Sequence, residues 1–422
     1  MRRLGPAMAE RDFALLWFAL LGMGISLQML EVAIGWEVFS NHQSALDLGW
    51  IGLAEFIPMF VLALPAGQLA DRLPRRRVLI CSLLLSSVVA VGLVVLSSST
   101  VTSVWPFLAL AMGAGTATAI GTPAARAMPP TLVGPELLES AMALRSIAVQ
   151  SAQVVGPALG GLLYQFSPGI VYGLAAAMCI AAAGCVVAMH RSPAADEVHK
   201  TPGTPGVASV LAGLRFVRHT EILLGAILLD LMAVLFGGAV ALLPLFARSI
   251  LHVGPTGLGV LRSAPAVGAL VAAAILTRRS LGGNAGRKLL LAVAVFGLSM
   301  IVFGLSRSFW LSLLALAVSG FADMFSMNIR ATTVALATPD RLRGRVLAVE
   351  MVFISASNQL GAFESGVAAF FLGAVPAVVA GGALTVVFAL SWGRLFPALA
   401  AVDRLKDLRP VEAPELEVAA PV

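Results

Sequence analysis

Gly67-Gln-Leu-Ala-Asp-Arg-Leu-Pro-Arg-Arg-Arg-Val-Leu79 is a short basic stretch between two long apolar runs. One run ends near Ala70 and the next begins at Val78. Four arginines and one aspartate therefore fall in a loop too short to be a domain. Because positive charge in a short loop marks the cytoplasmic side of a membrane protein, we expect this loop to lie at the inner edge of a membrane.

The composition is typical of a polytopic membrane protein. Of the 422 residues, 59% are hydrophobic and 12% are charged, which excludes an ordinary soluble domain. Because a membrane helix needs about 20 apolar residues, the chain has room for roughly a dozen spans. The net charge of +6 comes from loop arginines, so it indicates orientation and lipid contact and not nucleic-acid binding.

The apolar runs predict an all-α membrane protein with twelve transmembrane helices and both termini in the cytoplasm. About 25 of the 28 Lys and Arg residues then fall on the cytoplasmic side, and the exceptions are Arg248, Arg262 and Arg307. The expected spans are 13–39, 46–70, 78–96, 105–128, 137–164, 170–189, 222–250, 258–277, 289–305, 309–337, 346–372 and 375–396.

Polar segments divide the chain into two halves. We predict a six-helix bundle over 1–189 and a second, pseudo-symmetric one over 222–400. A cytoplasmic linker with an amphipathic helix is expected between them over 190–221. The polar tail over 401–422 is expected to be disordered.

The basic loop resembles the Gly-x-x-x-Asp-Arg-x-Gly-Arg-Arg pattern between helices 2 and 3 of the major facilitator superfamily. Pro74 replaces the second glycine of that pattern. The resemblance implies the major facilitator fold and a gating contact of the loop aspartate with the start of helix 11. The positions that match are Gly67, Asp71, Arg72, Arg75 and Arg76.

A second motif lies in the fifth predicted helix, from Ala152 to Gly161. It resembles the Gly-x-x-x-Gly-Pro-x-x-Gly-Gly antiporter motif of facilitator exporters, with Ala152 in place of the first glycine. Pro157 removes a backbone donor and bends the helix, and the glycines let a neighbouring helix approach closely. Ordinary small-residue packing is the alternative interpretation. The matching positions are Gly156, Pro157, Gly160 and Gly161.

Residues in the second half of the chain narrow the resemblance from the superfamily to one group of exporters. Residues 339–346, 353–358 and 363–366 resemble the exporter group that includes enterobactin and macrolide exporters, and Asn358 and Glu364 belong to this similarity. The chain departs from the group at Gln359 and Ala362, where the group has acidic residues. Helix 4 also lacks the early arginine of many drug–proton antiporters, since Ala109 and Leu110 stand there.

Ionisable residues inside the spans are the candidates for proton coupling or substrate binding, because such groups are costly in lipid and face a cavity or a partner. Glu31 and Asp230 have no basic residue nearby in their own helices. Asp323 and Arg330 share one face of a helix, so we predict a link between them, direct or through a third group. A structural ion pair is the alternative for each of these residues.

An internal repeat suggests two latches. An offset of 207 positions places Glu55 opposite Arg262, and an offset of 205 places Arg145 opposite Glu350. Because two rocking halves need a contact on each side that opens in turn, we predict an outer latch from the first pair and an inner latch from the second. The alternative is that each charge pairs within its own half or faces water in the cavity.

The sequence contains no catalytic constellation, no metal-ligand spacing and no phosphate-binding loop, so we expect neither an enzyme nor a cofactor. We predict a monomeric secondary exporter of the bacterial inner membrane, driven by protons, for a siderophore, drug or other amphipathic compound. Its expected partners are the lipid bilayer, that small molecule and protons. The alternatives are an importer or lipid transporter on the same fold, or a non-transporting membrane sensor or assembly partner.

Overall fold

The computed structural model describes residues 5–99, 103–190, 207–278 and 282–411, of which 63–72 and 207–210 are described by their backbone alone. Most of the predicted linker, at 191–206, and the end of the predicted tail, at 412–422, lie outside the described residues.

Twelve helical spans in the described part are long and apolar enough to cross a membrane, which confirms the predicted number. They are α1 (Arg11–His42), α2 (Ala45–Arg72), α3 (Arg75–Ser97), α4 (Trp105–Ala127), α6 (Leu138–Tyr164), α7 (Pro168–Val187), the span that begins with α10 (Glu221–Gly237), α12 (Gly254–Arg278), α13 (Ala285–Leu305), α14 (Phe309–Ala337), α15 (Asp340–Leu372) and α16 (Ala374–Leu395).

Short elements connect or end these spans. They are η2 (Pro6–Ala9), α5 (Pro129–Leu132), η3 (Pro135–Leu137), α9 (Val207–His219), η4 (Val240–Leu242), α11 (Leu243–Leu245), η5 (Phe246–Ile250), α17 (Pro397–Ala400) and η6 (Leu405–Asp407). The helix α9 lies where the sequence predicts an amphipathic one. Its Phe216 and Val217 are buried in a core that includes Val346 of α15.

The expected single helix over 222–250 is wrong in one respect, because the span is broken after Gly237. Two successive glycines favour a break, and Pro244 supplies no backbone donor to an earlier turn. The Ser365 hydroxyl of α15 donates to the Gly238 carbonyl at 2.8 Å. This bond satisfies an acceptor that a continuous helix would have used.

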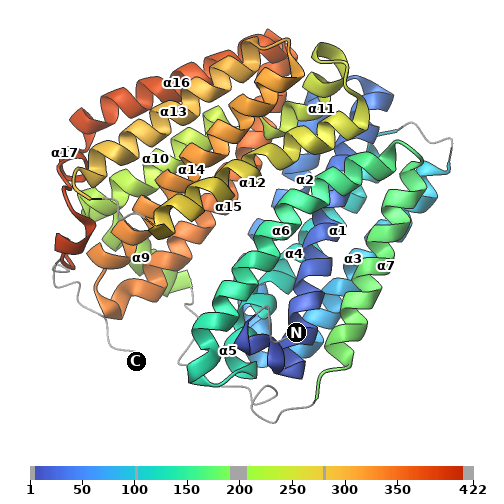
Figure 1. Ribbon diagram of the computed structural model, residues 1–422, viewed down its shortest axis with the longest axis horizontal. Coiled ribbons are helices and arrows are strands. Elements are labelled where there is room, and N and C mark those ends of the chain that lie inside the picture. Colours follow the sequence, from blue (N-terminus) through green and yellow to red (C-terminus); the bar gives the residue numbers. More distant parts are fainter. Residues whose placement is uncertain (1–4, 100–102, 191–206, 279–281, 412–422) are drawn as a thin grey trace.

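The spans form two groups, the first helix group (α1 to α7) and the second helix group (α10 to α16). Helices within each group pack mainly on one another, and the groups meet through α2 with α15 and α6 with α12. Figure 1 shows the first helix group in blue to green and the second in yellow-green to red. We call the end where α1 begins the terminal end and the opposite end the far end.

The two groups touch backbone to backbone at the far end. A Cβ atom on Gly161 of α6 would lie 2.3 Å from the Pro255 carbonyl oxygen of α12. One on Gly366 of α15 would lie 2.7 Å from the Gly49 Cα of α2. Only glycine permits such contacts, so these residues hold the far end closed in this conformation.

Candidate functional site

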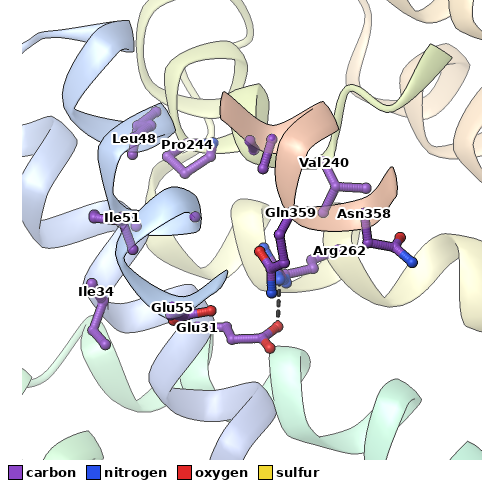
Figure 2. Close-up of a pocket in the computed structure, with 14 residues that line it drawn as sticks. Glu31, Ile34, Leu48, Ile51, Glu55, Val240, Pro244, Arg262, Asn358 and Gln359 are labelled. Atoms are coloured by element: carbon purple, nitrogen blue, oxygen red, sulfur yellow. Dashed lines mark hydrogen bonds and ion pairs between the residues drawn. The ribbon is translucent and has the colours of Figure 1, made fainter. Parts of the chain in front are cut away.

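A cavity of about 330 Å³ lies between the two helix groups. Its walls come from α1 and α2 of the first group and from η4, α11, α12 and α15 of the second. This volume falls in the range of small-molecule sites. Most of the wall is apolar, and the polar side chains gather on one side of the cavity, as Figure 2 shows. These polar residues are Glu31, Glu55, Arg262, Asn358 and Gln359.

An ion pair joins the two helix groups across this cavity. The Arg262 guanidinium of α12 donates a hydrogen bond to the Glu31 carboxylate of α1, marked by the dashed line in Figure 2. The two side chains are 18% and 26% exposed, so water screens the pair only partly. A charge-assisted bond of this kind is stronger than a neutral one. The tertiary structure thus supplies the partner that Glu31 lacks in its own helix.

Glu55 lies in the same cavity but is not paired with Arg262, because that guanidinium is bound to Glu31. Glu55 instead hydrogen-bonds Gln359 and interacts electrostatically with both charged neighbours. The predicted outer latch is therefore corrected for this conformation. The repeat alignment found the right arginine, but it could not show that α1 places a second acid closer to it.

A second charged cluster lies within the second helix group. Arg330 of α14 donates through Nη1 to Asp230 of α10, and its Nε lies 3.9 Å from the Glu350 carboxylate of α15. All three side chains are at most 10% exposed, and the Arg330 Nε has no hydrogen-bond partner. Asp323 interacts electrostatically with Asp230 and Arg330. Asp323 is therefore close enough to Arg330 to interact with it, as the shared helix face predicted. The residue that Arg330 binds directly is Asp230.

The predicted inner latch is not formed in this conformation. Glu350 faces Arg330, and no ion pair between Arg145 and Glu350 occurs among the described residues. Because the close contacts between the two helix groups lie at the far end, an inner latch would form only in the opposite conformation. This latch stays a prediction.

The arginines of the basic loop bind helix ends within the first helix group. Arg75 Nη1 donates to the Ala127 carbonyl at the end of α4, at 3.1 Å. Arg76 Nε donates to the Val186 carbonyl near the end of α7, at 2.9 Å. Guanidinium groups there satisfy free carbonyls and complement the negative helix terminus. Gly67, Asp71 and Arg72 are described by their backbone alone, so the gating contact stays a prediction.

The second motif lies where α6 meets two helices. A Cβ atom on Gly156 would lie 2.5 Å from the Gln28 Cβ of α1, and one on Gly160 would lie 2.9 Å from the Met29 Cα. Gly161 and the Pro157 carbonyl face α12 instead. The motif therefore packs α6 against α1 of its own group and α12 of the other.

Asn358 and Glu364, the two residues of α15 that the resemblance identified, line different cavities. Asn358 lines the central cavity and donates to the Ile354 carbonyl of its own helix at 2.8 Å. Glu364 lines a smaller cavity beside the break at Gly238.

One buried pair was missed by the sequence reasoning. Tyr172 of α7 donates to the Glu37 carboxylate of α1 at 2.5 Å, and both side chains are buried. Tyr164 of α6 also interacts with Glu37 and with Arg248 of η5. The sequence carries a signal for this pair, because Glu37 is an ionisable residue inside the first apolar run, like Glu31.

Comparisons with known proteins agree with this fold. A family model described as "Transmembrane secretion effector" matches residues 4–421. Among curated proteins, the enterobactin exporter EntS of Citrobacter koseri is 28% identical over 76% of each chain. EntS of Escherichia coli O81 is 27% identical over the same shares.

Solved transporter structures share the fold. The nucleoside transporter NupG, as its D323A mutant, has a TM-score of 0.74 and 12% identity, and the match covers 91% of this chain and 100% of that one. A bacterial homologue of the human lysosomal transporter Spinster has a TM-score of 0.67 and 15% identity, over 94% of this chain and 98% of that one. Such low identity shows the fold alone.

The family match, the twelve spans and the shared fold confirm the predicted membership of the major facilitator superfamily. The chain belongs to the transmembrane secretion effector family of this superfamily, and it is a multi-pass secondary transporter and not an enzyme.

Proposed function

We propose that the protein exports a small amphipathic molecule by proton antiport with alternating access. The observation that supports this most is the cavity between the two helix groups, crossed by the Arg262–Glu31 pair. A facilitator binds its cargo between two halves that rock around a central site. A contact that joins the halves at that site responds to the cargo and to the conformation.

Orientation follows from the loop charges. The predicted topology assigns about 25 of the 28 Lys and Arg residues to the cytoplasmic side, and this assigns the terminal end to the cytoplasm of a bacterial inner membrane. The glycine contacts of the far end then close the outer side. The described conformation is the one in which the inner side releases its contacts and cargo enters from the cytoplasm.

The charged cluster of the second helix group supports proton coupling. Three acids, Asp230, Asp323 and Glu350, interact with one guanidinium. An uncompensated buried charge is strongly unfavourable, so the cluster binds protons to balance its charge. A change in helix packing that moves Arg330 would release or recruit such a proton.

The curated relatives are named enterobactin exporters, so a siderophore is one candidate cargo and a drug-like amphipathic compound is another. A deletion strain screened for compound susceptibility and for metabolite export would find the cargo. Uptake of the compound, in place of export, would instead favour the importer alternative.

Proton coupling is tested with purified protein in liposomes that carry a pH gradient. We expect Glu31→Gln and Asp230→Asn to abolish uphill export and to leave downhill exchange, since each amide has nearly the shape of the protonated acid but cannot release a proton. Glu136→Gln, in the exposed segment before α6, is the matched control and should transport like the wild type. Substrate-induced proton release that persists in both single variants and in the double variant would remove these acids from the coupling step.

A further inference from the structure

The ionisable groups that line the central cavity do not all find a partner of opposite type. Two carboxyl groups, Glu31 and Glu55, and one guanidinium, Arg262, contribute to the wall. Arg262 is engaged by Glu31. The remaining carboxyl has a neutral amide, Gln359, as its hydrogen-bond partner. The charged groups that act on Glu55 are Glu31 and Arg262, from α1 and α12, while α15 contributes only the amide.

The position of Glu55 is fixed by its backbone. A Cβ atom on Gly115 of α4 would lie 2.2 Å from the Glu55 carbonyl oxygen, so α2 and α4 are in direct contact at this point. The Glu55 backbone therefore cannot move toward α4, and the side chain lines the cavity from this anchored position.

Apart from Asn358, the rest of the wall is apolar. Ile34, Leu48, Ile51, Val240 and Pro244 face the same space, as Figure 2 shows. Sites for small molecules combine such apolar walls with a few polar groups that fix orientation. A molecule that fits this cavity has an apolar body and one group that complements a carboxylate.

We propose, on the basis of the transport function above, that the cavity binds amphipathic organic cations and that Glu55 is the carboxylate that pairs with them. An anion would have to displace Glu31 from Arg262 and leave that acid unpaired in a partly buried site, which is strongly unfavourable. A cation needs no such exchange, because Glu55 forms no ion pair among the described residues and Arg262 is bound to Glu31.

Two probes of equal shape and opposite charge test the proposal, namely tetraphenylphosphonium and tetraphenylborate. Equilibrium binding to the purified full chain in neutral detergent is measured for each. We expect the wild type to bind the phosphonium, and Glu55→Gln to weaken that binding at least tenfold. Glu55→Asp keeps the charge and should retain most of the affinity.

The control is Glu364→Gln, which neutralises another acid of a spanning helix that lines a different cavity. It should bind the phosphonium within about twofold of the wild type, because this acid lines a different cavity. Size-exclusion profiles identify any variant that fails to fold, in which case the Glu55→Asp comparison decides.

Equal affinity of the wild type for the borate, or undiminished phosphonium binding by Glu55→Gln, would overturn the inference. Export of uncharged or anionic compounds without phosphonium binding would also overturn it, and would leave the proposed transport function intact. Phosphonium binding that depends on Glu55, without uphill export of any compound, would support the cation site and refute proton-driven export.

Discussion

The close contact between α6 and α12 predicts how the conformational equilibrium responds to one methyl group. In Gly161→Ala, the new Cβ would lie 2.3 Å from the Pro255 carbonyl oxygen and 2.9 Å from the Gly259 Cα. These atoms belong to the backbone of α12 and cannot rotate away. The helices must therefore separate by roughly 1 Å to restore ordinary van der Waals contact.

The energetic cost falls on one conformation only. Overpacking of this size costs about 1–3 kcal/mol, and it applies only while the far end is closed, since the two groups separate there in the opposite state. The equilibrium should shift toward the far-end-open state by about 5- to 150-fold. Gly173→Ala on α7 is the matched control, because its Cβ would meet nothing within 4 Å.

The shift is measured by double electron–electron resonance, which gives the distance between two spin labels across the far end. Spin labels at Phe166 and Ser249, which are exposed and belong to different helix groups, report the separation in a background without the native cysteines. We expect Gly161→Ala to add a population at longer distance. An unchanged distance distribution in a folded Gly161→Ala protein, or an equal shift in Gly173→Ala, would refute the steric reasoning.

Three further predictions concern charged residues. Asp71→Asn should lower transport without preventing membrane insertion, and normal transport by that variant at normal expression would exclude a gating role. Arg262→Glu should abolish transport, because it places a third acid beside Glu31 and Glu55, and Glu31→Arg in the same chain should restore part of it; transport assays of the single and double variants decide. Arg330→Leu should lower the melting temperature more than Asp230→Asn does, because it leaves acids unpaired at a cost of about 3–5 kcal/mol; equal melting temperatures would contradict this.

Much of the fold could be predicted from the sequence. Lipid offers no hydrogen bonds to the backbone, so each span must be a helix with apolar side chains. Each of the twelve spans is therefore visible in the sequence as an apolar run. Loop arginines indicate topology for a similarly local reason. Gly237, Gly238 and Pro244 permit the break after Gly237, but the hydroxyl that satisfies the freed carbonyl, from Ser365, belongs to a helix far along the chain.

The site was only partly predictable. The sequence identified Glu31, Asp230, Arg262 and Arg330 as ionisable groups inside spans, because charge in a membrane helix is conspicuous along the chain. Which acid meets which arginine was decided by the tertiary structure. Arg262 and Glu31 are 231 positions apart, and Arg330 and Asp230 are 100 apart. Helical periodicity defines the face of a residue, but the neighbour of that face is set by how close small residues let the helices approach.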